Sequence, residues 1–262
     1  MEKKVILAQK NPDILDIIQI TDCHLYSTDN GRFDGVDTGA SLARVIDSIN
    51  AGETPDAVLV TGDLVHDGEQ RGYQRLLDAL RRLRAGVYCL PGNHDKPKLM
   101  QQILNAANVT TDKVLQARDW YLVLLDTVLP DTHAGRLSGP ELDFLEETLR
   151  AAGERFVLVA MHHHPVSVHS RWMDAMMLEN PEDFFAVIDR YPAVRAISWG
   201  HIHQVFSRRR HDIALLGTPS TCRQFRLAGD SAAMDERAPP AYRRTRLHRD
   251  GRLDSEIHWI KQ

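Results

Sequence analysis

Residues 14–24 read ILDIIQITDCH, an apolar and β-branched run that ends in an aspartate and a histidine. The apolar part is too short for an ordinary helix and is typical of a buried strand. Similar short apolar runs follow along the chain, at residues 57–60, 87–90, 121–125, 156–160 and 194–198. The sequence therefore predicts a series of buried strands.

Segments between these strands have the periodicity of helices that bury one face. They cover residues 42–49, 69–84 and 141–149. Alternating strands and helices predict an α/β fold, with functional residues on the loops that leave the strand ends. Later in the chain, strands without long helices between them are predicted at residues 213–216, 242–247 and 256–260, and a long loop at residues 229–240. We therefore expect a second, partly antiparallel sheet that faces the first.

Length and composition are typical of one domain that spans residues 1–262, because 43% of the residues are hydrophobic and 26% are charged. The net charge of -4 gives no reason for non-specific binding to nucleic acid. No apolar stretch is long enough to span a bilayer, and the N-terminal segment lacks the features of a signal peptide. Three widely separated cysteines argue against a disulfide framework. We expect a cytoplasmic protein that binds neither nucleic acid nor membrane.

Five of the predicted strands are followed by side chains that can bind a metal ion. The segments are Asp22-Cys23-His24, Gly62-Asp63, Gly92-Asn93-His94-Asp95, His162-His163-His164 and Gly200-His201-Ile202-His203. The glycines stand where a tight turn or a close backbone approach needs the smallest residue. Oxygen and nitrogen ligands without thiolates suit Mn, Fe, Mg, Co or Zn. The sequence therefore predicts a metal site at the strand ends.

The spacing of the candidate ligands supports this prediction. In an extended segment, residues two positions apart point to the same side. Asp22 and His24 can then direct two ligands into one cavity, as can His201 and His203, while Cys23 points away. An isolated pair of this kind is more often structural than catalytic. Five such strand ends in one α/β chain favour a metal site.

The residues from Asp22 to His203 resemble the signature of the calcineurin-like metallophosphoesterases, and the flanking strands match as well. Within that superfamily, residues 159–166, 199–204 and 218–225 are most similar to the bacterial class III 3',5'-cyclic AMP phosphodiesterases. The resemblance implies an α/β metallo-dependent phosphatase-like sandwich, in which two facing mixed β-sheets are flanked by helices. It also implies a nucleotide substrate, with hydrolysis of cyclic AMP to 5'-AMP.

The family pattern implies two divalent metal ions, with Fe or Mn as the best candidates and Mg, Co or Zn as the others. The first ion would be held by Asp22, His24 and His203, the second by Asn93, His163 and His201, and both by Asp63. His163 is chosen within the histidine triplet because the family histidine lies two residues before a proline, here Pro165. Alternation along the chain would turn His162 and His164 to the other side.

The resemblance also implies how the site would work. Two ions about 3.5–4 Å apart can clamp a phosphodiester and supply a metal-bound hydroxide as the nucleophile. The ions outweigh the two aspartates in charge, so an acidic protein can still attract a phosphate monoanion. His94 is expected to stabilise the phosphate or protonate the leaving alkoxide, and its alternative role is to orient Asn93. The residues expected to contact substrate are His24, Asp63, Asn93, His94 and His203.

Several alternatives stay open. Family members share metal chemistry and differ in the loops around it, so glycerophosphodiesters, 2',3'-cyclic nucleotides and nucleotide-linked lipids are alternative substrates. A non-catalytic scaffold is expected to have lost ligands, whereas the set here is complete. Residues 208–210 are interpreted as a solvated turn rather than a substrate contact, and Arg223 is a candidate substrate contact. Trp172 and the methionines at 173, 176 and 177 suit an apolar wall against a base, a capping helix or the contact of a homodimer.

Overall fold

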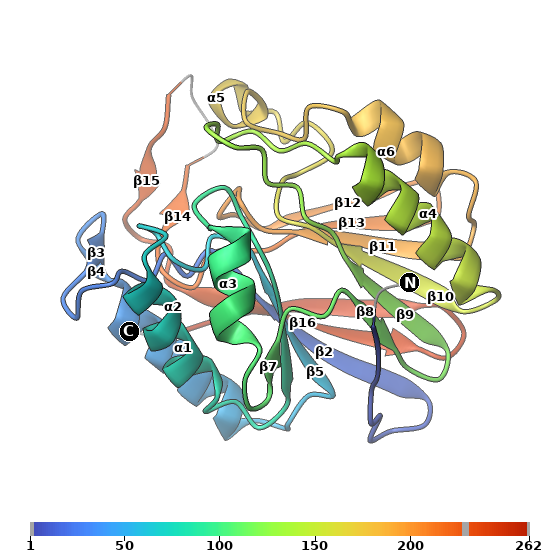
Figure 1. Cartoon of the computed structure of the whole chain (residues 1–262), viewed down its shortest axis with the longest axis horizontal. Coiled ribbons are helices and arrows are strands. Elements are labelled where there is room, and N and C mark those ends of the chain that lie inside the picture. The colour runs from blue at the N-terminus through green and yellow to red at the C-terminus, as the bar shows by residue number, and fades with distance from the viewer. Residues whose placement is uncertain (1–2, 227–230, 261–262) are drawn as a thin grey trace.

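Two β-sheets face each other in the computed structural model, which describes residues 3–226 and 231–260 (Figure 1). The seven-stranded sheet contains, in spatial order, β1 (Lys4–Ile6), β8 (Val114–Gln116), β9 (Trp120–Leu124), β10 (Phe156–Ala160), β11 (Val194–Trp199), β13 (Ile213–Gly217) and β12 (Phe206–Arg210). The six-stranded sheet contains, in spatial order, β17 (Leu253–Trp259), β16 (Ala241–His248), β2 (Ile14–Ile20), β5 (Ala57–Thr61), β6 (Gly86–Leu90) and β7 (Val109–Thr110).

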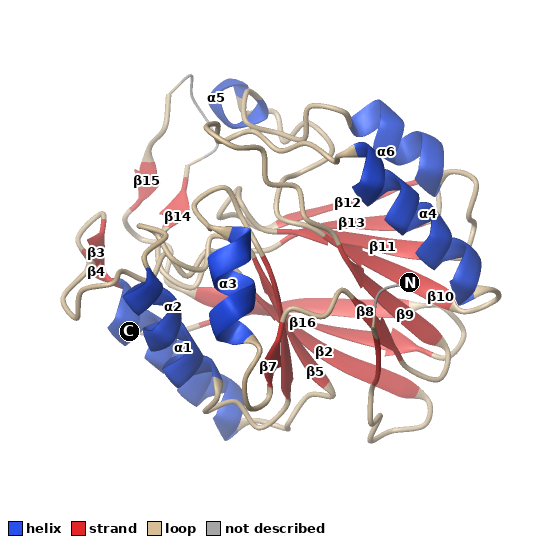
Figure 2. Cartoon of the chain, viewed as in Figure 1, coloured by secondary structure: helices blue, strands red, loops and turns tan. Residues whose placement is uncertain are grey.

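Helices flank the two sheets, so that the strands form the centre of a layered structure (Figure 2). Beside the six-stranded sheet lie α1 (Thr38–Ala51), α2 (Gln70–Leu80) and α3 (Pro97–Leu104), and beside the seven-stranded sheet lie α4 (Gly139–Ala152) and α6 (Pro181–Ile188). Three smaller elements complete the described chain, namely α5 (Arg171–Asp174), the hairpin of β3 (Arg32–Phe33) and β4 (Val36–Asp37), and the hairpin of β14 (Gln224–Phe225) and β15 (Met234–Asp235). The predicted fold class is confirmed.

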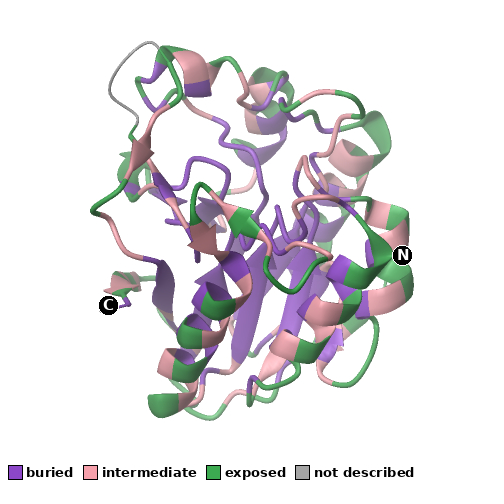
Figure 3. Cartoon of the chain, turned by 90° about the vertical axis from the view of Figure 1, so that its left-hand side faces the viewer, coloured by how far each residue is buried: buried purple, intermediate pink, exposed green. Residues whose placement is uncertain are grey.

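Side chains along a strand alternate between two apolar layers. In β10, Val157 and Val159 pack with the residues of α4 and α6, whereas Leu158 and Ala160 point into the layer between the sheets. Because both faces of such a strand are buried, its sequence is a continuous apolar run rather than an alternating one. The buried strands lie at the centre of Figure 3, and exposed residues lie on the outer faces of the helices and on the surface loops.

Strand direction brings the functional loops together. In the six-stranded sheet β2, β5 and β6 run parallel, and in the other sheet β9, β10, β11 and β13 run parallel. Antiparallel pairs, β16 with β2 and β12 with β13, make both sheets mixed. The carboxyl ends of parallel strands meet at one edge, which is where α/β sheets place their sites.

Most of the predicted strands and helices are confirmed, whereas the end of one predicted helix and one predicted turn differ. The strands at residues 14–20 and 156–160 begin and end where predicted. The helix predicted at residues 69–84 ends at Leu80, because residues 81–84 turn back toward β6. The solvated turn predicted at residues 208–210 is wrong, because these residues pair with β13 as an edge strand. Arginine side chains suit such an edge, since charge discourages pairing with another chain.

The loop predicted at residues 229–240 is only partly described. Residues 229 and 230 lie outside the described residues, and residues 234–235 form β15 within the predicted loop. The helices α3 and α6 and the short strands at the sheet edges are not predicted from the sequence. Each is so short that its apolar pattern rests on few residues, and neighbouring elements decide its conformation.

Candidate metal centre

The backbone is left-handed at five residues predicted to bind metal. Asp22, His24, Asp63, His201 and His203 have φ angles of 52°, 43°, 49°, 63° and 46°. Such backbone is uncommon outside glycine, costs on the order of 1–3 kcal/mol where it is strained, and clusters at functional sites. The extended segments predicted for Asp22 with His24 and for His201 with His203 are therefore wrong. Left-handed backbone at single loop residues, not alternation along a strand, directs these side chains.

Glycine is required where two ligand loops touch. A Cβ atom on Gly200 would lie 2.0 Å from Oγ1 of Thr21, and one on Gly92 would lie 2.3 Å from the backbone nitrogen of Asp63. Both distances are far below van der Waals contact, so any larger residue would push the loops apart. The predicted close approach at these glycines is confirmed.

The first group of ligand atoms belongs to Asp22, His24 and His203, which are buried and whose ligand atoms lie within 4.8 Å of one another. Nε2 of His203 is 3.2 Å from Nε2 of His24 and 3.1 Å from Oδ1 of Asp22. Nδ1 of His203 donates to the carbonyl of Arg223 at 2.7 Å, so Nε2 carries the lone pair of the neutral ring. Burial lowers the pKa of His24 well below its ordinary value, despite the charge of Asp63. Neutral imidazole nitrogens beside a carboxylate form a suitable cation site.

The second group of ligand atoms belongs to His162, His163 and His201, which are also buried and lie within the same distance limit of 4.8 Å. Nδ1 of His163 is hydrogen-bonded to Oγ1 of Thr127 at 2.7 Å. Nε2 of His163 and Nε2 of His201 have no hydrogen-bond partner among the residues that the structure describes. Burial, and then the neighbouring histidines, lowers the pKa of both rings. A divalent ion needs imidazoles in this neutral, unpaired form.

His162 turns toward the centre, although alternation predicted that it points away. Its Nδ1 donates to the carbonyl of Thr61 at 2.9 Å, and its Nε2 lies 3.3 Å from Oδ1 of Asp63 and 3.2 Å from Oδ1 of Asn93. The prediction is wrong because the chain bends at residues 162 and 163 instead of continuing β10. Burial alone would lower the pKa of His162, but Asp63 and Asp22 outweigh it and raise this pKa to about 9.

Asp63 faces the two groups of ligand atoms, whereas His164 faces away from Asp63. Burial alone would raise the pKa of Asp63, but His162 and His24 outweigh it and hold this pKa well below its ordinary value. Asp63 is therefore a carboxylate placed between the two groups. His164 lies away from that carboxylate, with its Nε2 3.5 Å from Oδ1 of Asp174, as its predicted orientation requires.

Asp95 holds two ligand loops in register. Its carboxylate accepts hydrogen bonds from the N–H groups of Gly92 at 2.9 Å and Leu64 at 3.0 Å, and from the hydroxyl of Tyr73 at 3.0 Å. Burial and the charge of Asp63 raise the pKa of Asp95 to about 6. The loops that follow β5 and β6 therefore share one buried carboxyl group.

Three further histidines line the outer side of the centre. Nδ1 of His94 donates to the carbonyl of His66 at 3.1 Å, and Nδ1 of His66 is 3.1 Å from Nδ1 of His24. Nδ2 of Asn93 lies 3.0 Å from Nδ1 of His133, so the amide can donate there and turn Oδ1 toward His162. His66 and His133 are not predicted from the sequence, since neither stands in a motif. The high number of histidines, 13 in the chain, is the signal that could have included them.

Aromatic rings form the rim of the first group. Phe33 stacks on His24 with ring centroids 4.6 Å apart, and Phe225 stacks on His203 at 4.1 Å. Arg223 forms an ion pair with Asp34 of the β3–β4 hairpin at 2.8 Å. The guanidinium of Arg223 is therefore already occupied, which weakens its candidacy as a substrate contact.

Comparison with known sequences gives the family. A sequence model described as Calcineurin-like phosphoesterase matches residues 15–205. The chain belongs to the calcineurin-like phosphoesterase family. The matched range includes every residue of both ligand groups, so this phosphoesterase has its candidate metal centre in the part that defines the family.

Relatives of this phosphoesterase have names that state an activity. The 3',5'-cyclic adenosine monophosphate phosphodiesterase CpdA of Pseudomonas aeruginosa is 40% identical over 92% of this chain and 88% of its own length. The 3',5'-cyclic-nucleotide phosphodiesterase alr5338 of Nostoc is 38% identical over 94% of this chain and 92% of its own length. The CpdA protein of Escherichia coli K12 is 34% identical over 98% of this chain and 94% of its own length.

Solved structures confirm the fold of the phosphoesterase. A dimetal phosphatase from Danio rerio is similar with a TM-score of 0.59 at 15% identity, over 95% of this chain and all of that chain. The purple acid phosphatase PPD1 from yellow lupin seeds is similar with a TM-score of 0.62 at 10% identity, over 95% of this chain and 54% of that chain. Among the described residues, no helix combines the length and apolar character that a bilayer crossing needs.

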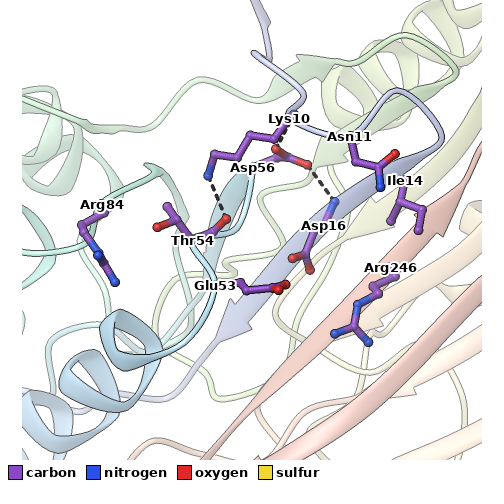
Figure 4. Close-up of a pocket in the computed structure, with 9 residues that line it drawn as sticks. All are labelled: Lys10, Asn11, Ile14, Asp16, Glu53, Thr54, Asp56, Arg84 and Arg246. Atoms are coloured by element: carbon purple, nitrogen blue, oxygen red, sulfur yellow. Dashed lines mark hydrogen bonds between the residues drawn. The ribbon is translucent and has the colours of Figure 1, made fainter.

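A hollow of about 640 Å³ in this phosphoesterase lies at the opposite ends of the strands (Figure 4). It borders the amino ends of β2 and β5, and its charged groups are largely paired within the chain. Nζ of Lys10 donates to the carbonyl of Thr54 at 2.7 Å, and Asp56 accepts the N–H of Asp16 at 2.9 Å. The hollow therefore lies apart from the candidate metal centre.

Proposed function

We propose that this chain is a phosphodiesterase that uses two divalent metal ions to hydrolyse 3',5'-cyclic nucleotides, with cyclic AMP converted to 5'-AMP. The observation that carries the proposal is the pair of buried ligand groups on either side of Asp63. The relatives named as cyclic AMP phosphodiesterases, at 40% and 34% identity over 92% and 98% of the chain, support the choice of substrate.

The metal ligands in this proposal are Asp22, His24 and His203 for the first ion, Asn93, His163 and His201 for the second, and Asp63 for both. The buried nitrogens of His163 and His201 without a described partner support the second ion, and His162 is a further candidate ligand. Oxygen and nitrogen donors suit Fe or Mn, and also Mg, Co or Zn. When bound, such ions supply Lewis acidity for the phosphate oxygens and acidify a water molecule.

In this proposal His94 supplies a proton to the leaving group, and His133 orients the amide of Asn93. His94 is half-buried, so it can reach a bound substrate. Its Nδ1 proton is engaged by the carbonyl of His66 at 3.1 Å, so the imidazolium form of the ring carries its second proton on Nε2 and can transfer that proton to the leaving alkoxide. Proton transfer of this kind contributes about 10²–10⁴-fold to the rate. His133 supports the amide of Asn93, whose Oδ1 is the proposed ligand atom.

A side-by-side product assay tests the proposal. Protein reconstituted with Mn²⁺ or Fe²⁺ is given cyclic AMP, 2',3'-cyclic AMP, bis(p-nitrophenyl) phosphate and a glycerophosphodiester. We expect 5'-AMP from cyclic AMP, with loss of turnover after chelation. Preference for the glycerophosphodiester with cyclic AMP untouched would refute the substrate, and inactivity toward all four compounds would refute the phosphodiesterase itself.

A second part of the proposal concerns the compartment, the domain organisation and the partners of the enzyme. We place it in the cytoplasm as one domain over residues 1–262, without nucleic acid or membrane as a partner. All three cysteines, Cys23, Cys89 and Cys222, are buried free thiols, which suits a reducing compartment.

A further inference from the structure

His66 contacts both a proposed metal ligand and the proposed proton donor. Nδ1 of His66 is 3.1 Å from Nδ1 of His24, and its carbonyl accepts the Nδ1 proton of His94 at 3.1 Å. The rings of His66 and His94 are stacked, with centroids 4.6 Å apart and planes inclined by 23°. A half-buried residue outside the family ligand set therefore links the two functional groups.

The position of one proton defines what His66 does. Nε2 of His24 faces Nε2 of His203 at 3.2 Å and Oδ2 of Asp63 at 3.7 Å, so Nε2 is the atom available to a cation. An imidazole that binds a cation through Nε2 carries its proton on Nδ1. That proton lies toward Nδ1 of His66, which must then accept it and keep its own proton on Nε2.

The backbone holds His66 in position for this contact. The N–H of His66 donates to the carbonyl of Leu25 at 2.9 Å, and the N–H of Leu25 donates to the carbonyl of Leu64 at 3.1 Å. The segments that carry His24 and His66 are thus joined as neighbouring strands are. The ring of Tyr26, centred 4.6 Å from that of His66, packs beside it. Little side-chain freedom is lost when the two imidazoles meet.

We propose that His66 is a positioning residue of the first metal site. Its Nδ1 accepts the Nδ1 proton of His24 and so fixes the ring and tautomer in which Nε2 of His24 binds the ion. Partners of this kind orient metal ligands, and their removal lowers metal affinity about 10–100-fold. This inference rests on the proposed function and assigns a role to a residue that the ligand pattern omits.

Two substitutions of similar size separate the acceptor from mere packing. In His66→Asn the side-chain oxygen can occupy the place of Nδ1 and accept the proton, whereas His66→Leu fills a similar space without an acceptor. His211→Asn is the control, because His211 is exposed and has φ 53°, which asparagine also adopts. Mn²⁺ binding is measured by competition with a chelator, and the melting temperature is recorded for each variant.

We expect His66→Leu to bind one of the two ions about 10–100-fold more weakly and the other unchanged. His66→Asn and His211→Asn should bind both ions as the wild type does. Wild-type affinities in His66→Leu would overturn the proposal, as would a His66→Asn variant as weak as His66→Leu. Equal weakening of both ions with a lower melting temperature would make His66 merely structural. If wild-type protein does not bind two ions, the proposed function is refuted as well. If wild-type protein binds two ions and hydrolyses cyclic AMP while the His66 variants bind metal normally, only the positioning role of His66 is refuted.

Discussion

The substitution Thr127→Val tests whether His163 is a metal ligand. Thr127 is fully buried, and its hydroxyl is 2.7 Å from Nδ1 of His163. Valine has nearly the shape of threonine, so the substitution removes the hydrogen bond without opening a cavity. A bound metal ion would hold the ring of His163 in place, so the ring could not turn to find another hydrogen-bond partner. The lost hydrogen bond therefore destabilises the metal-bound state more than the metal-free state.

Two separate estimates of the loss in metal affinity agree for Thr127→Val. A buried polar atom that loses its partner costs about 1–3 kcal/mol. At about 1.4 kcal/mol for each tenfold change in affinity, this corresponds to roughly 5- to 150-fold weaker binding. Removal of a hydrogen-bond partner from a metal ligand typically costs about 10–100-fold. We therefore expect the second ion to bind about 10–100-fold more weakly in Thr127→Val, with the first ion unaffected.

Competition between the protein and a chelator for Mn²⁺ measures both affinities in the same titration. Thr148→Val is the matched control, because Thr148 is also buried but lies on α4. Unchanged affinity for both ions in Thr127→Val would contradict the assignment of His163 and would favour His162 as the ligand. Together with His66→Leu, this variant distinguishes the two sites, since each substitution should weaken a different ion.

Three further predictions concern turnover, folding and pH. His94→Ala should lower turnover about 10²–10⁴-fold with nearly unchanged metal content, and metal loss as severe as in Asp63→Asn would contradict its role. Asp95→Ala leaves the N–H groups of Leu64, Val65 and Gly92 without an acceptor at about 1–3 kcal/mol each, so urea unfolding should show a loss of at least about 3 kcal/mol, and an unchanged midpoint would contradict its linking role. In metal-free protein, burial holds the pKa values of three histidines well below 6.5, namely His24, His163 and His201. Unfolding lets these rings bind protons, so stability should be lost as pH falls below about 6.5. The groups with raised pKa values oppose this loss only in part, and they are His162, Asp95, Asp126 and Glu141. A urea midpoint that rises between pH 7 and pH 5 would exclude this explanation.

The layers of the fold follow from apolar runs that the sequence displays directly. The strands at residues 14–20 and 156–160 are buried on both faces, so the second run is continuous, the first is interrupted only by Asp16 and Gln19, and the ends of both are easily read. The edge strand at residues 206–210 carries three consecutive arginines, and only its pairing with β13 makes it a strand. Conformation there is decided by a neighbour distant in sequence, which local patterns do not contain.

The ligand types could be predicted from the sequence, but their directions could not. Left-handed backbone at Asp22 and His201, and the bend at residues 162 and 163, replace the alternation assumed for an extended chain. That assumption placed His162 on the wrong side. His66 was missed for a related reason, because the hydrogen bonds that align its loop with Leu25 join two loops that are distant in sequence.

Crystals of the chain grown with Mn²⁺ allow the most direct test of a shared two-ion centre, through anomalous scattering from the metal. We predict two peaks about 3.5–4 Å apart, both within bonding distance of the Asp63 carboxylate. A single peak, or two peaks that do not share Asp63, would contradict the proposed centre and the chemistry that depends on it.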